Sequence, residues 1–141
     1  NKNVPKFETE SLLSGKKFIS SEIFGKEVTL VNFFATWCKP CLDEHNYIQR
    51  FSNQTELKII GINYKDNNHR TIKWLKDLGN PYSYVIADKK GRIAIEWGVY
   101  GIPETFIVDS KGIIKYRQAG PISKKNYKKI NLIINKIKND S

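Results

Sequence analysis

The sequence contains no methionine, only two cysteines, and no long run of apolar residues. The cysteines are too few and too close together to form a disulfide framework, because a bridge across two intervening residues removes little chain entropy. A chain of 141 residues needs no such framework, since it buries about two thirds of its unfolded surface. No apolar run approaches the ~20 residues of a membrane-spanning helix, and no signal-peptide pattern is visible. We therefore expect residues 1–141 to fold as a single domain.

Acidic residues are also scarce, since 14 Asp and Glu stand against 24 Lys and Arg, for a formal net charge of +10. The excess lies late in the chain, where Lys111 to Lys138 includes nine basic residues and no acidic one. A solvated basic helix face is the plainest interpretation, and contact of this C-terminal region with an anionic membrane surface is the second. No nucleic-acid-binding motif or aromatic stacking platform accompanies the charge, so no nucleic-acid partner is expected.

Runs of β-branched and aromatic residues predict the strands of a central sheet. They cover residues 28–35, 57–62, 84–87, 105–108 and 113–117, the last two joined as a hairpin. Nearer the N-terminus, residues 4–7 and 17–19 predict short edge strands or extended arms, and residues 20–25 predict one helical turn.

Helical spacing of apolar residues predicts helices over 42–51 and 67–78, and a third that begins after its N-cap, Ser123. The apolar stripe of the second helix is formed by Ile72, Leu75 and Leu78, and that of the third by Tyr127, Ile130, Ile133, Ile134 and Ile137. Strands that alternate with helices and end in a hairpin indicate an α/β fold, with a mixed central sheet flanked by helices.

The two cysteines, Cys38 and Cys41, stand where the strand at 28–35 gives way to a helix, a position typical of a redox dithiol. Unpaired N–H groups and the positive end of the helix dipole stabilise a thiolate at Cys38, and Lys39 adds a nearby cation. Pro40 fits the first helical turn, where its missing N–H costs little. We expect Cys38 to be the exposed nucleophile and Cys41 the buried resolving thiol.

Two thiols can also bind a metal. Zinc needs two more ligands, which only His45 and His69 could supply, at spacings that match no common zinc site. Cu(I) suits thiolates, but the chain has no methionine to assist. We therefore expect no metal site and keep a copper-binding thiol module as an alternative.

A second site is expected at residues 98–106, where Pro103 directly precedes a predicted strand. Such a proline cannot donate to the sheet and restricts the residue before it. If the Ile102–Pro103 bond is cis, the chain turns sharply and leaves backbone groups of Ile102 free to pair with an extended peptide. Alone, an ordinary turn proline is the better interpretation. Beside a Cys-x-x-Cys pair, Ile102 and Pro103 become one wall of a substrate groove, with Trp37 and Pro40 on the other side.

Together these stretches resemble the DsbE/CcmG family, the membrane-tethered periplasmic thioredoxin-like reductases of cytochrome c maturation. The resemblance runs from Val4 to Gly120 and is carried by residues 32–38, 44–45, 61–66, 74–82 and 98–106. Cys-x-x-Cys combined with Gly-Val-Tyr-Gly-x-Pro-Glu-Thr-Phe is highly specific. The resemblance implies a thioredoxin-like fold with an N-terminal extension and a central insertion. It also implies a periplasmic protein, tethered to the inner membrane by an N-terminal segment that is not part of this chain.

The resemblance further implies partners and a cycle. The substrate is expected to be the oxidised Cys-x-x-Cys of an apocytochrome c or of a haem-lyase component. A membrane reductant of the DsbD or CcdA type is expected to return Cys38 and Cys41 to the dithiol, with no other cofactor. Thioredoxin and DsbA share the cysteine spacing but differ by about 150 mV, so the direction of electron flow rests on the resemblance. A general envelope thiol oxidoreductase is the alternative enzyme.

One departure from cytoplasmic thioredoxins concerns the acid beneath the active site. The position of their buried aspartate is Asn32 here, which cannot titrate. If Cys41 needs a proton acceptor, Glu44 and Glu104 are the candidates, and both match acidic positions of the family. Their plainer roles are a helix-dipole contact in the first turn for Glu44 and a solvated loop acid for Glu104.

For His45, Trp74 and Trp97, which lie near these motifs in the sequence, we expect positions in the fold and no part in the chemistry. His45 follows the first helical turn and is expected to face solvent. Trp74 and Trp97 are expected to pack in the protein interior.

Overall fold

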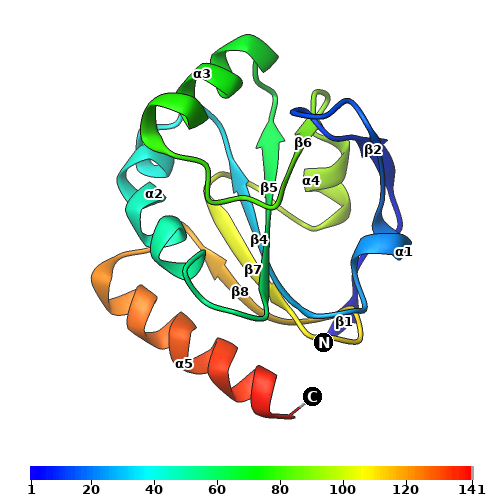
Figure 1. Ribbon diagram of the computed structural model, residues 1–141, viewed down its shortest axis with the longest axis vertical. Coiled ribbons are helices and arrows are strands. Elements are labelled where there is room, and N and C mark those ends of the chain that lie inside the picture. Colours follow the sequence, from blue (N-terminus) through cyan, green and yellow to red (C-terminus); the bar gives the residue numbers. More distant parts are fainter. Residues whose placement is uncertain (141) are drawn as a thin grey trace.

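A mixed six-stranded sheet with the order β1-β8-β7-β4-β5-β6 organises the computed structural model, which describes residues 1–140 (Figure 1). Its strands are β1 (Lys2–Asn3), β4 (Val28–Phe34), β5 (Leu57–Tyr64), β6 (Tyr84–Asp88), β7 (Glu104–Val108) and β8 (Ile113–Ala119). The pairs β4–β5 and β5–β6 are parallel, whereas β4–β7, β7–β8 and β8–β1 are antiparallel. A separate ribbon pairs β2 (Glu8–Glu10) with β3 (Lys17–Ile19). Ser141, the last residue of the predicted domain, lies outside the described residues.

Helices cover both faces of the sheet. They are α1 (Ser20–Ile23), α2 (Lys39–Phe51), α3 (Asn68–Leu78), α4 (Arg92–Glu96) and α5 (Lys124–Asp140). Buried side chains of α2, α3 and α5 share one core cluster, and those of α4 share the other with the N-terminal segment. Figure 1 shows the same division, with α4, α1 and β2 on the side of the sheet opposite α2. Within residues 1–140, no helix combines the length and the hydrophobicity that a membrane crossing requires.

Strand β4 lies at the centre of this arrangement, between β5 and β7. All seven of its residues are buried, as expected for a near-continuous run of β-branched and aromatic residues covered by helices on both faces. It ends at Phe34, and Cys38 is the N-cap of α2. The two cysteines therefore lie at the carboxyl end of the central strand.

The predicted α/β class, the mixed sheet and the five central strands are confirmed. Of the two interpretations given for residues 4–7, the extended arm is confirmed and the edge strand is wrong. Between β1 and β2, the Val4 N–H donates to the Gly112 carbonyl and the Phe7 N–H donates to the Ser20 hydroxyl. The segment between β5 and β7 holds α3, β6 and α4, of which α4 forms from the apolar stretch around residues 93–95.

The apolar stripe predicted for α3 is partly wrong. Ile72 and Leu78 are exposed, and the helix buries Thr71 and Leu75 instead. The Thr71 hydroxyl donates to the Asn63 side chain at 2.9 Å, so the polar residue that this helix buries has its partner in β5. Apolar spacing alone does not reveal such a contact.

Candidate functional site

Cys38 and Cys41 form a disulfide, with their Cα atoms 5.3 Å apart. The Cys41 N–H points at Cys38 Sγ from 3.3 Å, so an otherwise unpaired donor of the first helical turn faces the predicted nucleophile. Pro40 occupies the start of α2, as predicted. Lys39 forms an ion pair with Asp43 at 2.6 Å, so the Asp43 carboxylate partly neutralises the positive charge that was expected to act on Cys38 Sγ.

The expected exposure of Cys38 is not found in this disulfide-bonded form. Cys38 is 6% exposed and Cys41 2% exposed. The Cys38 sulfur is bonded to Cys41 and lies 3.9 Å from the carbonyl oxygen of Ile102, and these neighbours cover it. Of the two, Cys38 remains the nearer to solvent.

The Ile102–Pro103 peptide bond is cis, the geometry that the groove hypothesis required. The loop before β7 thus places the Ile102 carbonyl beside the sulfur of Cys38. On the other side of the pair, Trp37 is 55% exposed, and its indole N–H donates to the Lys65 carbonyl at 3.1 Å. The disulfide is therefore bordered by an exposed aromatic ring and by a backbone acceptor, the two kinds of group that bind an extended peptide.

Asp66, which the sequence analysis did not single out, fixes the turn before the cysteines. Its carboxylate accepts from the Thr36 N–H at 2.6 Å, from the Thr36 hydroxyl at 3.0 Å, from Asn67 N–H at 2.8 Å and from Asn63 Nδ2 at 3.2 Å. Burial raises the pKa of Asp66, but these hydrogen bonds outweigh it and hold the pKa below its usual value. A carboxylate in the loop after β5 thus holds the residue that precedes Trp37.

Glu44 is buried in a polar cluster beneath the active site. One carboxylate oxygen accepts from Asn32 Nδ2 at 2.8 Å and the other from the Ile122 N–H at 3.0 Å. Asn32 also donates to the Thr105 hydroxyl at 3.2 Å and accepts from the Tyr82 hydroxyl at 2.8 Å. Burial raises the pKa of Glu44 from 4.5 to about 7, against the opposing effect of the two hydrogen bonds. A carboxyl group with this pKa exchanges protons near neutral pH.

The helix-dipole role considered for Glu44 does not match its position. Helix α2 begins at Lys39, three residues before the predicted start, so Asp43 and Glu44 fall outside its first turn. Glu44 points inward, and each of its carboxylate oxygens accepts a hydrogen bond within the cluster. Tyr82 reaches Asn32 because the neighbouring strand carries Gly61, where a Cβ atom would lie 2.8 Å from the tyrosine ring.

Glu104 is buried as well, so it is not the solvated loop acid that was considered. Its Oε1 accepts from Arg117 Nε at 2.7 Å, and its Oε2 accepts from the Tyr100 N–H at 3.2 Å. Both oxygens of Glu104 are thus held by partners outside α2, whereas Glu44 lies one helical turn after Cys41 on α2 itself. The geometry therefore favours Glu44 over Glu104 as a base for Cys41.

The prediction that His45 faces solvent is wrong. The ring is buried, its Nε2 lies 2.8 Å from the Gly79 carbonyl, and it packs edge-on against Trp74 at 4.7 Å between centroids. Burial lowers the pKa of His45, and the hydrogen bond to Gly79 only partly opposes this. The packing roles of Trp74 and Trp97 are confirmed, since Trp74 stacks on Phe34 and Trp97 lies among the aromatic rings of the other core cluster.

Two members of the site escaped sequence reasoning, namely Asp66 and Tyr82. A signal for the cluster was present, because Asn32 carries an amide in the middle of the buried central strand and must find partners there. The sequence does not say which distant residues supply them. In the described part of the chain, no group of three or more potential metal-ligating side chains gathers.

The raised pKa of Glu44 predicts a pH-dependent stability. Below pH 4.5 the carboxyl is neutral in the folded and unfolded states, and its contribution to stability is fully present. As the pH rises to about 7 the unfolded chain loses the proton first, so the free energy of unfolding falls by about 3 kcal/mol from this group.

The measurement is urea unfolding between pH 4.5 and 8, compared between the wild type and Glu44→Gln. His45, whose pKa is lowered, changes stability in the opposite direction, and the comparison cancels it because both proteins carry it. We expect the stability of the variant relative to wild type to increase with pH. Parallel curves for the two proteins would contradict the prediction.

Comparison with known proteins shows the family to which this chain is similar. The sequence profile of the redoxin family matches residues 1–131. The thiol:disulfide interchange protein DsbE of Vibrio cholerae is 43% identical over 126 residues, which are 89% of this chain and 68% of that protein. DsbE of Escherichia coli is 45% identical over 124 residues, which are 86% of this chain and 66% of that protein. The chain thus spans about two thirds of the length of these relatives.

A solved structure agrees with the sequence comparison. The thiol:disulfide interchange protein of Chlorobium tepidum, a thioredoxin family protein, superposes with a TM-score of 0.74 at 28% identity. The alignment covers 96% of this chain and 95% of that one. The fold predicted from the sequence, thioredoxin-like with a mixed sheet between helices, is confirmed.

Proposed function

Because the chain belongs to the redoxin family and to its DsbE thiol:disulfide interchange proteins, we propose that it reduces protein disulfides in the cell envelope. The chain is a thioredoxin-like disulfide oxidoreductase, and Cys38–Cys41 is its Cys-x-x-Cys pair. Within that activity, we propose as substrate the oxidised Cys-x-x-Cys of an apocytochrome c or of its haem-ligation partner, in the periplasm. The identity to DsbE proteins over most of the chain supports this choice.

The proposed cycle moves two electrons from the reduced pair to the substrate. The Cys38 thiolate attacks one sulfur of the substrate disulfide, that S–S bond breaks, and a mixed disulfide to Cys38 forms. The released substrate thiolate takes a proton. The Cys41 thiol then gives its proton to Glu44 and attacks Cys38 Sγ. This releases the second substrate thiolate and leaves the Cys38–Cys41 disulfide. A membrane dithiol donor of the DsbD or CcdA type returns the pair to the reduced state.

The observation that carries the proposal is the Cys38–Cys41 pair at the start of α2, with the buried Glu44 carboxyl one helical turn after Cys41. Burial raises the pKa of Glu44 to about 7. A resolving thiol as deeply buried as Cys41 needs a nearby group that accepts its proton at neutral pH. The Ile102 carbonyl and the Trp37 ring supply the walls along which a substrate segment is held.

The equilibrium of the Cys38–Cys41 pair with glutathione tests the direction of electron flow. We expect a reduction potential below about −200 mV, nearer to thioredoxin at about −270 mV than to DsbA at about −120 mV. A potential near that of DsbA would overturn the reductase assignment. In the same buffer, reduction of an oxidised Cys-x-x-Cys-His peptide is compared with that of insulin. Equal rates would favour a general envelope thiol oxidoreductase over a cytochrome c substrate.

A further inference from the structure

The outer edge of β8 is largely open. Strand β1 pairs only with Ile113 and Ile114, and among residues 1–140 no other strand pairs with this edge. The Gly120 N–H donates inward to the Pro103 carbonyl at 3.0 Å. Because an antiparallel ladder alternates, the N–H and C=O groups of Arg117 and Ala119 then point outward. An open edge of this kind is a template for pairing with another strand.

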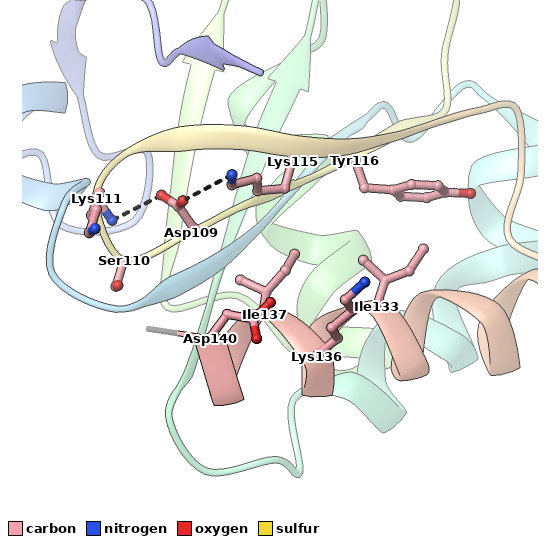
Figure 2. Close-up of a pocket in the computed structure, with 9 residues that line it drawn as sticks. All are labelled: Asp109, Ser110, Lys111, Lys115, Tyr116, Ile133, Lys136, Ile137 and Asp140. Carbon is pink, nitrogen blue, oxygen red and sulfur yellow. Dashed lines mark hydrogen bonds and ion pairs between the residues drawn. The ribbon is translucent and has the colours of Figure 1, made fainter.

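A basic cavity borders one side of β8. It measures about 450 Å³ and lies between the β7–β8 hairpin and α5. Figure 2 shows Lys115 and Tyr116 on the strand above it, with Lys136 reaching up from the helix. Lys115 lies 3.9 Å from Asp109, and Lys129 adds a further cation 5.6 Å from the centre of the Tyr116 ring. The lining carries three lysines, Lys111, Lys115 and Lys136, against two aspartates, Asp109 and Asp140, and Lys115 is paired with Asp109. Side chains that enter from this side therefore meet a net positive charge.

A second cavity borders the other side, and we call it the apolar cavity after the aromatic and branched side chains that line it, although Lys2, Glu96 and Arg117 line it as well. It measures about 530 Å³ and is lined by α4 and the loop after it, by the N-terminal arm and by β8. At its rim, Ile95 is 75% exposed and Tyr100 is 97% exposed. Trp97 also lines the cavity, and its buried indole N–H has no hydrogen-bond partner. A buried donor without an acceptor is costly, so an acceptor brought by a ligand would be favoured here.

We propose that the edge of β8 from Tyr116 to Ala119 binds an extended acidic segment of a partner protein as an added strand. In such a strand, successive side chains point to opposite faces of the sheet. One set would therefore meet the lysines of the basic cavity, and the other set the rings and the isoleucine of the apolar cavity. The preferred sequence alternates acidic residues with aromatic or branched apolar ones.

A second copy of this chain fits the edge poorly. Pairing β8 with itself about a two-fold axis would bring Lys115 and Arg117 of both copies together, and like charges across a strand pair are destabilising. The irregular register at Ile107 and Val108, opposite Lys115, also interrupts a long flat edge. These features suit an acidic partner better than self-association.

The open edge leads toward the redox site. Ala119 pairs with Glu104, the residue after Pro103, and β7 in turn pairs with β4. With strands about 4.8 Å apart, a strand added to β8 lies about 15 Å from β4. A partner held there has its neighbouring segments within reach of Cys38. This inference does not depend on the direction of electron flow.

The test uses a fluorescein-labelled peptide in which Glu alternates with Val and Phe, and a matched peptide with Lys in place of Glu. Ala119→Pro removes an outward N–H without touching the β7 ladder, whereas Ala119→Thr retains it. We expect Ala119→Pro to bind the acidic peptide about tenfold more weakly than wild type. Ala119→Thr should bind like wild type. Lys115→Glu with Lys136→Glu should weaken binding of the acidic peptide, and the lysine peptide should not bind to the proteins that keep Lys115 and Lys136.

Several outcomes would overturn the proposal. Equal binding by the Pro and Thr variants would show that the edge is not used. Equal binding of the acidic and basic peptides would remove the charge argument. A dimer in sedimentation that Ala119→Pro dissociates would assign the edge to a second copy. Exchange with oxidised glutathione should be the same in all variants, so a failed redox function and a failed docking site give different results.

Discussion

Serine in place of Cys41 is expected to stop thiol–disulfide exchange after its first step, so that the substrate protein stays covalently attached to Cys38. Serine matches the small volume of the buried thiol, but its hydroxyl does not attack a disulfide at neutral pH. Cys38 keeps its place at the N-terminus of α2, beside the Ile102 carbonyl, and still reacts. Multiple turnover should fall to the uncatalysed rate while the mixed disulfide accumulates.

Non-reducing electrophoresis after incubation with an oxidised substrate protein measures the adduct, and mass spectrometry identifies its partner. Cys38→Ser is the matched control, because it retains one thiol of the pair but removes the predicted nucleophile. That variant should form no adduct. If it formed as much adduct as Cys41→Ser, the assignment of nucleophile and resolving thiol would be wrong. If neither variant formed one, the enzyme assignment itself would lose its support.

Glu44→Gln is expected to slow the second step, the attack of Cys41 on the mixed disulfide, by about a hundredfold near neutral pH. The amide cannot accept the Cys41 proton. In the wild type, the rate of this step should rise with pH through about 7, as the Glu44 carboxyl loses its proton and becomes able to accept another. In the variant this rise should be absent. Stopped-flow measurement of single-turnover reduction between pH 5.5 and 8.5 provides both numbers.

Two other acids serve as controls. Asp43→Asn changes an exposed neighbour of Glu44 that is paired with Lys39, and should leave the pH profile intact. Glu104→Gln removes the partner of Arg117 and tests the other buried glutamate. A wild-type profile in Glu44→Gln, with the rise near pH 7 lost in Glu104→Gln, would transfer the proton-acceptor role to Glu104. Circular dichroism of each variant at pH 7 separates loss of the base from loss of the fold.

The central strand and the helix after it could be predicted from the sequence because their signals are local. The apolar run of β4, the cysteine spacing and the proline before β7 each lie within a few residues. The position of His45 could not be predicted in this way, since it depends on Trp74 and Gly79, which arrive from another helix. The same holds for the Arg117–Glu104 pair, which joins two strands across a hairpin. Sequence patterns show which residues are polar, but not which distant partner each one meets.

The strand order also fixes when the active site comes into being. Both cysteines are made in the first third of the chain, but Ile102, which borders Cys38, and Ile122, which binds Glu44, come much later. During synthesis β4 can pair with β5 early, and its other edge stays unpaired until β7 has emerged. A half-made chain therefore carries a reactive dithiol without its proline wall and an apolar strand with one open side. Selectivity is the last property that the growing chain acquires, long after it has acquired reactivity.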